Sequence, residues 1–85
     1  MAQGKRISAD IVVETLEAIR ALGAEARAAR TSRGEGQASA AARLGVHVQT
    51  IARIESGEPG VSAGHLLGML ALYGISVVPA KSVPD

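Results

Sequence analysis

The sequence predicts an all-α fold of five short helices, followed by one short β-strand near the C-terminus. The chain has 85 residues, which is enough for one domain. Apolar residues recur at helical spacing through most of its length. Glycines interrupt that spacing and divide the pattern into helix-sized segments. The dividing glycines are Gly23, Gly34, Gly45, Gly57 and Gly74.

The first helix is expected over residues 10–21, after a flexible tail over residues 1–9. Ser8 or Asp10 can cap its start, and its apolar side chains follow helical spacing. Gly23 costs a continuous helix about 1 kcal/mol relative to Ala, so we expect a break or kink there. A second helix then follows and ends near Arg33.

The stretch from residue 36 to residue 57 carries the most information. It predicts two short helices, over residues 37–44 and 48–56, joined by a tight turn around Gly45. That layout is typical of a helix-turn-helix, in which one helix braces and the next enters the DNA major groove. Ser62 is a good N-cap for a last helix over residues 63–73. We expect the whole helix-turn-helix domain to span residues 22–74.

Residues 75–85 are expected to form a dimerisation strand and a tail. The branched side chains in this segment favour a strand, and Pro79 ends it. A single strand in a helical chain has no partner, so we expect it to pair with the same strand of a second copy. The alternative is an extended tail over the helices. The side chains assigned to the dimer contact are Ile75, Val77 and Val78.

Composition limits the class of protein. The chain has no Cys, which excludes disulfides and thiolate metal sites. It shows no signal peptide and no stretch near the roughly 20 apolar residues of a membrane span, so we expect a soluble cytoplasmic protein. Phe and Trp are absent. The core of one copy is therefore small, and a homodimer is expected.

Charge is distributed unevenly although the net charge is only +1. The N-terminal third is acidic, whereas residues 27–53 hold five arginines and one acid, Glu35. A local basic surface is what contact with DNA phosphates requires. The alternative is a solvated, arginine-rich helix surface.

The predicted helix over residues 48–56 has a polar outer face. Gln can pair with adenine, Arg with guanine, and Val can meet a thymine methyl group. Ala52 is small enough to let the helix approach the bases, and Thr50 lies at the margin of the face. The alternative is an ordinary amphipathic helix. The outward positions are Val48, Gln49, Ala52 and Arg53.

This stretch resembles the Xre family of helix-turn-helix regulators, the group of the lambda repressor and Cro. That family favours a Gln at the start of the first motif helix, an Ala in its middle and a Leu-Gly-Val turn. It also favours Gln-Thr-Ile in the second helix, then Ile-Glu and a Gly. The matching positions are Gln37, Ala41, Leu44-Gly45-Val46, Gln49-Thr50-Ile51, Ile54-Glu55 and Gly57.

The resemblance implies a lambda-repressor-like fold with the helix over residues 10–21 as an extra N-terminal element. It also implies roles for single residues. Gln37 matches a phosphate-contacting Gln, and Thr50 matches a phosphate or base-edge contact. Arg30 and Glu55 match a buried ion pair of the scaffold. The base-reading positions of the family match Val48, Gln49 and Arg53.

The chain departs from the family pattern in places. Ala40 stands where a Leu is common, which thins the core. Glu35 and Gly36 replace an apolar residue and a Ser or Thr cap, and His47 replaces the cap of the second motif helix. We expect His47 to act as a cap or a phosphate contact.

The expected function is that of a sequence-specific DNA-binding regulator, a dimeric repressor that reads a palindromic operator. The C-terminal segment also resembles HipB-type antitoxins, which bind a kinase-like toxin and repress their own operon. A protein-interaction module is the third alternative. No metal, cofactor or catalytic constellation is expected, because His47 and His65 lie far apart in sequence and no acids cluster with them.

Overall fold

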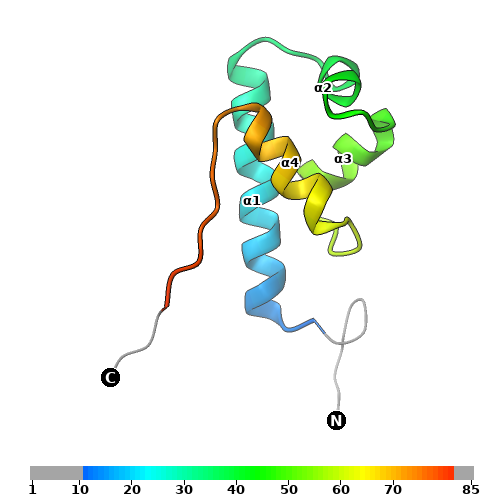
Figure 1. The fold of residues 1–85 in the computed structure, drawn as a ribbon. Helices are drawn as coiled ribbons and strands as arrows, with labels where there is room; N and C mark the ends of the chain where they lie inside the picture. Colours follow the sequence, from blue (N-terminus) through cyan, green and yellow to red (C-terminus); the bar gives the residue numbers. More distant parts are fainter. Residues whose placement is uncertain (1–10, 82–85) are drawn as a thin grey trace.

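The computed structural model describes residues 11–81. This part of the chain holds four helices and no strand: α1 (Val13–Ser32), α2 (Gln37–Leu44), α3 (Val48–Ser56) and α4 (Ala63–Leu72). The long α1 runs along one side of the three short helices (Figure 1). The all-α prediction is confirmed, whereas the prediction of five helices is wrong. None of these four helices is long and apolar enough to cross a membrane.

The predicted break at Gly23 is wrong, because α1 is one uninterrupted helix of 20 residues that contains Gly23. Gly23 is buried against α3. A Cβ atom added there would collide with the backbone oxygen of Ile54 and lie 3.3 Å from that of Glu55. Gly23 therefore allows two helix backbones to approach closely and does not end a helix.

The two motif helices, α2 and α3, have the predicted bounds. α2 ends at Gly45, whose φ of 80° is left-handed, and its N–H donates to the Ala41 oxygen at 2.8 Å. The Val46 N–H donates to the same oxygen at 3.0 Å, so the turn satisfies its own backbone groups. α3 ends in the same way at Gly57, with φ 79°.

The core lies where α1, α3 and α4 meet. Four large side chains are fully buried, and small alanines from α1 and α2 fill the space between them. Ala40 of α2 is completely buried in this core. The fully buried large side chains are Ile51, Ile54, Met69 and Leu70.

The start of α4 agrees with the sequence. The Ser62 side chain accepts a hydrogen bond from the His65 N–H at 3.1 Å, which makes Ser62 the predicted N-cap. The helix is one residue shorter than expected, because Tyr73 is its C-cap. His47 stands at the N-cap of α3 but makes no side-chain cap bond.

The strand predicted after Gly74 is not formed within the described chain. Ile75 packs against the chain's own core and its N–H donates to the Leu70 oxygen at 3.0 Å, so it does not face outward. From there the segment to residue 81 is extended and exposed, and it leads away from the end of α4 (Figure 1). A strand needs a partner edge, and the helices of one copy offer none. The predicted tail over residues 1–9 lies outside the described residues.

Candidate nucleic-acid interface

The outward side of α3 is open among the described residues. Gln49, Ala52 and Arg53 are exposed, and 44% of the surface of Val48 is accessible to solvent. Ile51 on the opposite side is completely buried, so the helix cannot turn this face inward without losing its core contact. The structure therefore brings the predicted base-reading residues together on one accessible surface.

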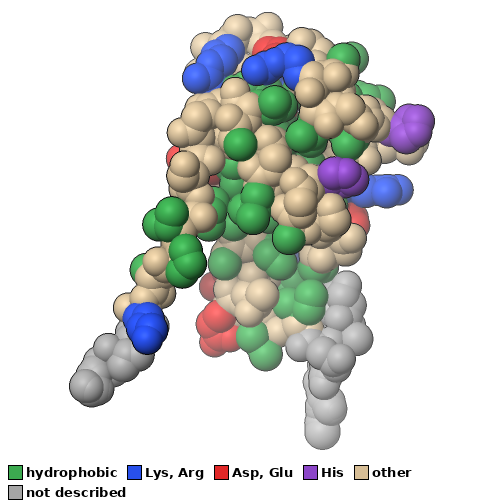
Figure 2. All heavy atoms as spheres, viewed as in Figure 1, with side chains coloured by type: hydrophobic (Ala, Val, Ile, Leu, Met, Phe, Trp, Pro, Cys, Tyr) green, Lys and Arg blue, Asp and Glu red, His purple; other side chains and the backbone are tan. Residues whose placement is uncertain are grey.

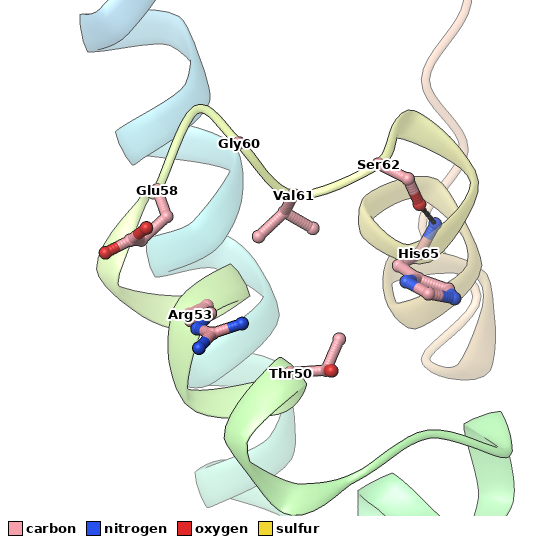
Figure 3. Close-up of a pocket in the computed structure, with 7 residues that line it drawn as sticks. All are labelled: Thr50, Arg53, Glu58, Gly60, Val61, Ser62 and His65. Carbon is pink, nitrogen blue, oxygen red and sulfur yellow. Dashed lines mark hydrogen bonds between the residues drawn. The ribbon is translucent and has the colours of Figure 1, made fainter. Parts of the chain in front are cut away.

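A polar groove borders this face on the side of α4. It is lined by Thr50 and Arg53 from α3, the loop after α3, and Ser62 and His65 at the start of α4 (Figure 3). Both histidine side chains of the chain lie on this side of the molecule (Figure 2). A guanidinium, a hydroxyl and an imidazole in this groove can bind phosphate oxygens, and the Glu58 carboxylate at its edge is the one group of opposite effect. The sequence analysis assigned no role to His65 in this groove.

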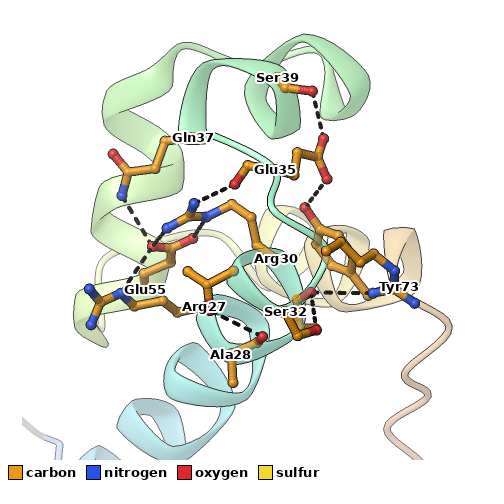
Figure 4. Close-up of polar contacts among 12 residues, drawn as sticks. Arg27, Ala28, Arg30, Ser32, Glu35, Gln37, Ser39, Glu55 and Tyr73 are labelled. Atoms are coloured by element: carbon orange, nitrogen blue, oxygen red, sulfur yellow. Dashed lines mark hydrogen bonds and ion pairs between the residues drawn. The ribbon is translucent and has the colours of Figure 1, made fainter.

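Glu55, at the end of α3, joins α3 to α1 and α2 (Figure 4). Arg30 of α1 donates from Nε to Oε2 at 2.6 Å and from Nη2 to Oε1 at 3.0 Å. Gln37 Nε2 donates to Oε1 at 3.1 Å. The Arg30 and Glu55 side chains are only 9% and 4% exposed. This bidentate, buried pair fixes α3 on α1.

The protonation of this pair follows from its contacts. Burial alone would raise the pKa of Glu55, but hydrogen bonds from Arg30 and Gln37 outweigh it and hold the pKa below its usual value. The hydrogen bond to Glu55 raises the pKa of Arg30 further. Both groups are therefore charged at neutral pH. The Gln37 amide nitrogen carries two hydrogens, so one remains for a further acceptor.

A comparison with protein families finds a match to a model described as a helix-turn-helix domain, over residues 21–81. The chain belongs to this helix-turn-helix family. In a helix-turn-helix, the second helix of the motif is the one that enters the DNA major groove, and α3 occupies that position in the chain. No curated protein and no solved structure matches the chain. Within residues 11–81 no group of three His, Asp or Glu side chains could hold a metal ion.

Glu35, in the loop before α2, is the structural residue of this helix-turn-helix domain that the sequence interpretation missed. Its carboxylate accepts hydrogen bonds from Ser39 at 2.7 Å, Arg43 at 2.8 Å and Tyr73 at 2.8 Å. Its backbone oxygen accepts from Arg30 at 2.7 Å. The only sequence signal was that Glu35 is the single acid among five arginines.

Tyr73 connects this cluster to α4. Its ring is buried, and the guanidinium carbons of Arg33 and Arg43 lie 5.0 and 5.5 Å from the ring centroid. Burial and the hydrogen bond to Glu35 raise the pKa of Tyr73, so the hydroxyl stays a donor at neutral pH. Glu35 and Tyr73 thus hold the start of α2 against the end of α4.

The hydrogen bonds from Ser39 and Tyr73 lower the pKa of Glu35 from 4.5 to about 2. A carboxylate with a lowered folded pKa stabilises the fold fully above its unfolded pKa, and this contribution is lost as pH falls through the folded pKa. We therefore expect Glu35→Gln to be less stable than wild type at pH 7. The difference should shrink between about pH 4.5 and pH 2. Thermal melts at a series of pH values measure it, and a constant difference would contradict the assignment.

Proposed function

We propose that this protein is a transcriptional repressor of the Xre type that binds a palindromic operator as a homodimer. The observation that carries this proposal is the exposed face of α3, whose four outward residues stand beside a groove suited to phosphates. Membership of the helix-turn-helix family supports it.

In the proposed complex, α3 lies in the major groove. Gln49 pairs with an adenine, Arg53 with a guanine, and Val48 contacts a thymine methyl group. Each good bidentate pair contributes about 1–3 kcal/mol of discrimination against a wrong base. Thr50 and His47 at the margin of α3, and Gln37 at the start of α2, contact phosphates and set the register.

The proposed dimer uses the C-terminal segment. Val77 is 46% exposed and Val78 is 72% exposed, and hydrophobic side chains along this segment stand clear of the helices (Figure 2). An extended segment with free backbone groups pairs readily with a second copy. Such a pair would present two α3 helices about 34 Å apart, one turn of DNA.

The experiment that tests this function selects binding sites for the wild-type protein from random DNA and compares the double variant Gln49→Ala, Arg53→Ala. We expect the wild type to select a palindrome that binds two chains. The double variant should lose at least about 100-fold of its preference for that palindrome over random DNA, because two bidentate contacts are gone.

Both altered side chains are exposed, so the melting temperature of the double variant should match that of the wild type. Gln37→Ala serves as the comparison, because loss of a phosphate contact weakens binding to all sequences alike. An undiminished preference for the palindrome in the double variant would refute the proposed reading face.

A second candidate function is an antitoxin or another protein-interaction module. Val12 and Val13, at the start of α1, are 57% and 59% exposed, and the acidic Glu14 and Glu17 follow them. That surface is suited to a protein partner with apolar and basic groups. A chain that binds no duplex at low salt, but retains a kinase-like protein encoded beside it, would favour this candidate.

A further inference from the structure

Two shallow hollows meet at Arg27, on the side of α3 away from α4. The first hollow lies between α1 and α3 and is lined by Arg27, Gln37, Ala52, Glu55 and Ser56. The second continues along α1 and is lined by Ala24, Arg27, Ala28, Thr31 and Glu55. Both are polar and open, and Ala52 belongs to the first hollow as well as to the outward face of α3.

We propose that these hollows bind the DNA sugar–phosphate backbone, with Arg27 as a phosphate contact supplied by α1. The inference rests on the proposed function, since it adds a contact with the same bound DNA. It adds a second contact with the DNA backbone, on the side of α3 opposite the groove that contains His65. The recognition helix is then flanked by a backbone contact on each side.

The Arg27 guanidinium is positively charged and accessible. Its side chain is 67% exposed, and its only ion pair among the described residues is a contact of 4.0 Å from Nε to Glu55 Oε1. Glu55 already accepts closer hydrogen bonds from Arg30 and Gln37 (Figure 4). The long contact therefore orients Arg27 without using most of its five N–H donors, which are suited to phosphate oxygens.

The wall beyond Arg27 is made of small side chains. Ala24, Ala28 and Thr31 are exposed on one side of α1, and the span from Ala24 to Thr31 is about 10 Å at 1.5 Å per residue. Measured along the duplex axis, this length corresponds to roughly three base pairs at 3.4 Å each. No long side chain in this wall prevents a backbone from lying against the helix.

The position of Ala52 fixes which part of the DNA reaches the hollow. Ala52 lies between the base-reading side chains and Arg27, on the surface of α3. When α3 lies in the major groove, the adjoining hollow meets the edge of that groove, which is a line of phosphates. The expected contact is independent of base sequence, because phosphates carry no base identity.

The experiment measures the affinity of the full chain for random duplex over a series of salt concentrations. We expect Arg27→Ala to bind every duplex about three- to tenfold more weakly at low salt. The slope of log K against log salt should become shallower by about 0.9, the value for one lost phosphate contact. Arg27→Lys should restore the slope, because it keeps the charge.

The matched control is Arg33→Ala, which removes the arginine at the C-cap of α1, where the guanidinium lies over the Tyr73 ring. Its slope should equal that of the wild type. A second pair tests the wall. Ala28→Glu puts a negative charge in the hollow and should weaken binding at least tenfold. Ala18→Glu, about 15 Å further along α1, should not.

The outcomes separate the two claims. A wild-type chain that binds no duplex at low salt would overturn the proposed function. A wild-type chain that binds with a steep salt dependence, while Arg27→Ala keeps the full slope and Ala28→Glu binds like Ala18→Glu, would overturn this inference alone. Circular dichroism confirms that each variant is folded.

Discussion

Gly23→Ala is expected to destabilise the protein by about 3 kcal/mol, the upper part of the range for overpacked sites. The added methyl group would meet the backbone oxygen of Ile54, which cannot move aside as a flexible side chain can. α1 would have to shift away from α3 and strain the Arg30–Glu55 pair. A thermal melt should show a fall of about 12–24 °C for a domain of this size.

The matched control is Gly64→Ala, a change of the same type in the exposed first turn of α4. A Cβ atom there would meet only the Ser62 Oγ, at 3.9 Å. Ala is a better helix former than Gly, so this variant should gain up to about 1 kcal/mol. If Gly23→Ala were also stabilising, the α1 and α3 backbones would have room for a Cβ atom at this position, and the expected collision would be refuted.

Gly23 also shows why the sequence could not predict the number of helices. The propensity cost of one glycine is about 1 kcal/mol, and burial against a neighbouring helix easily outweighs it. Whether a glycine ends a helix or lets another backbone approach depends on contacts with residues some 30 positions away. Gly45 was predictable because its left-handed conformation follows from local hydrogen bonds and nothing else lies within 4 Å of its missing Cβ. Gly57 has the same conformation, but a Cβ there would also meet the Arg20 backbone.

The helices of the motif and the outward face of α3 were predictable for the same local reason. Apolar spacing decides which side of a short helix is buried, and Ile51 and Ile54 left only one side free. The C-terminal segment was harder. Its branched residues favour a strand, yet Ile75 packs against the core of its own chain, and pairing needs a strand edge that residues 11–81 do not offer.

The Glu35 cluster could not be predicted from local pattern. Its contact with Tyr73 joins residues 38 positions apart, and no spacing rule connects them. In the sequence, Glu35 differs from the pattern of the resembled family only in being polar where that pattern has an apolar residue. In the structure it supplies two oxygens that three donors share, which gives the loop before α2 its anchor.

We expect the second large effect at Arg30. Arg30→Met removes one member of a pair whose side chains are only 9% and 4% exposed. It leaves the Glu55 carboxylate buried with Gln37 and the distant Arg27 as its only partners. Breaking a buried pair in this way costs about 3–5 kcal/mol. Since a small domain is stable by only about 5–15 kcal/mol, denaturant unfolding should show a loss of much of the total.

Two controls identify the buried charge as the cause. Arg27→Ala removes the exposed, 4.0 Å partner of the same carboxylate and should cost no more than about 0.5 kcal/mol. The double variant Arg30→Met, Glu55→Leu removes both charges and should recover most of the stability lost in the single variant. A double variant as unstable as Arg30→Met would contradict this explanation. The stability would then come from the hydrogen bonds of Arg30 to the loop and of Glu55 to Gln37, and not from the neutralised charge.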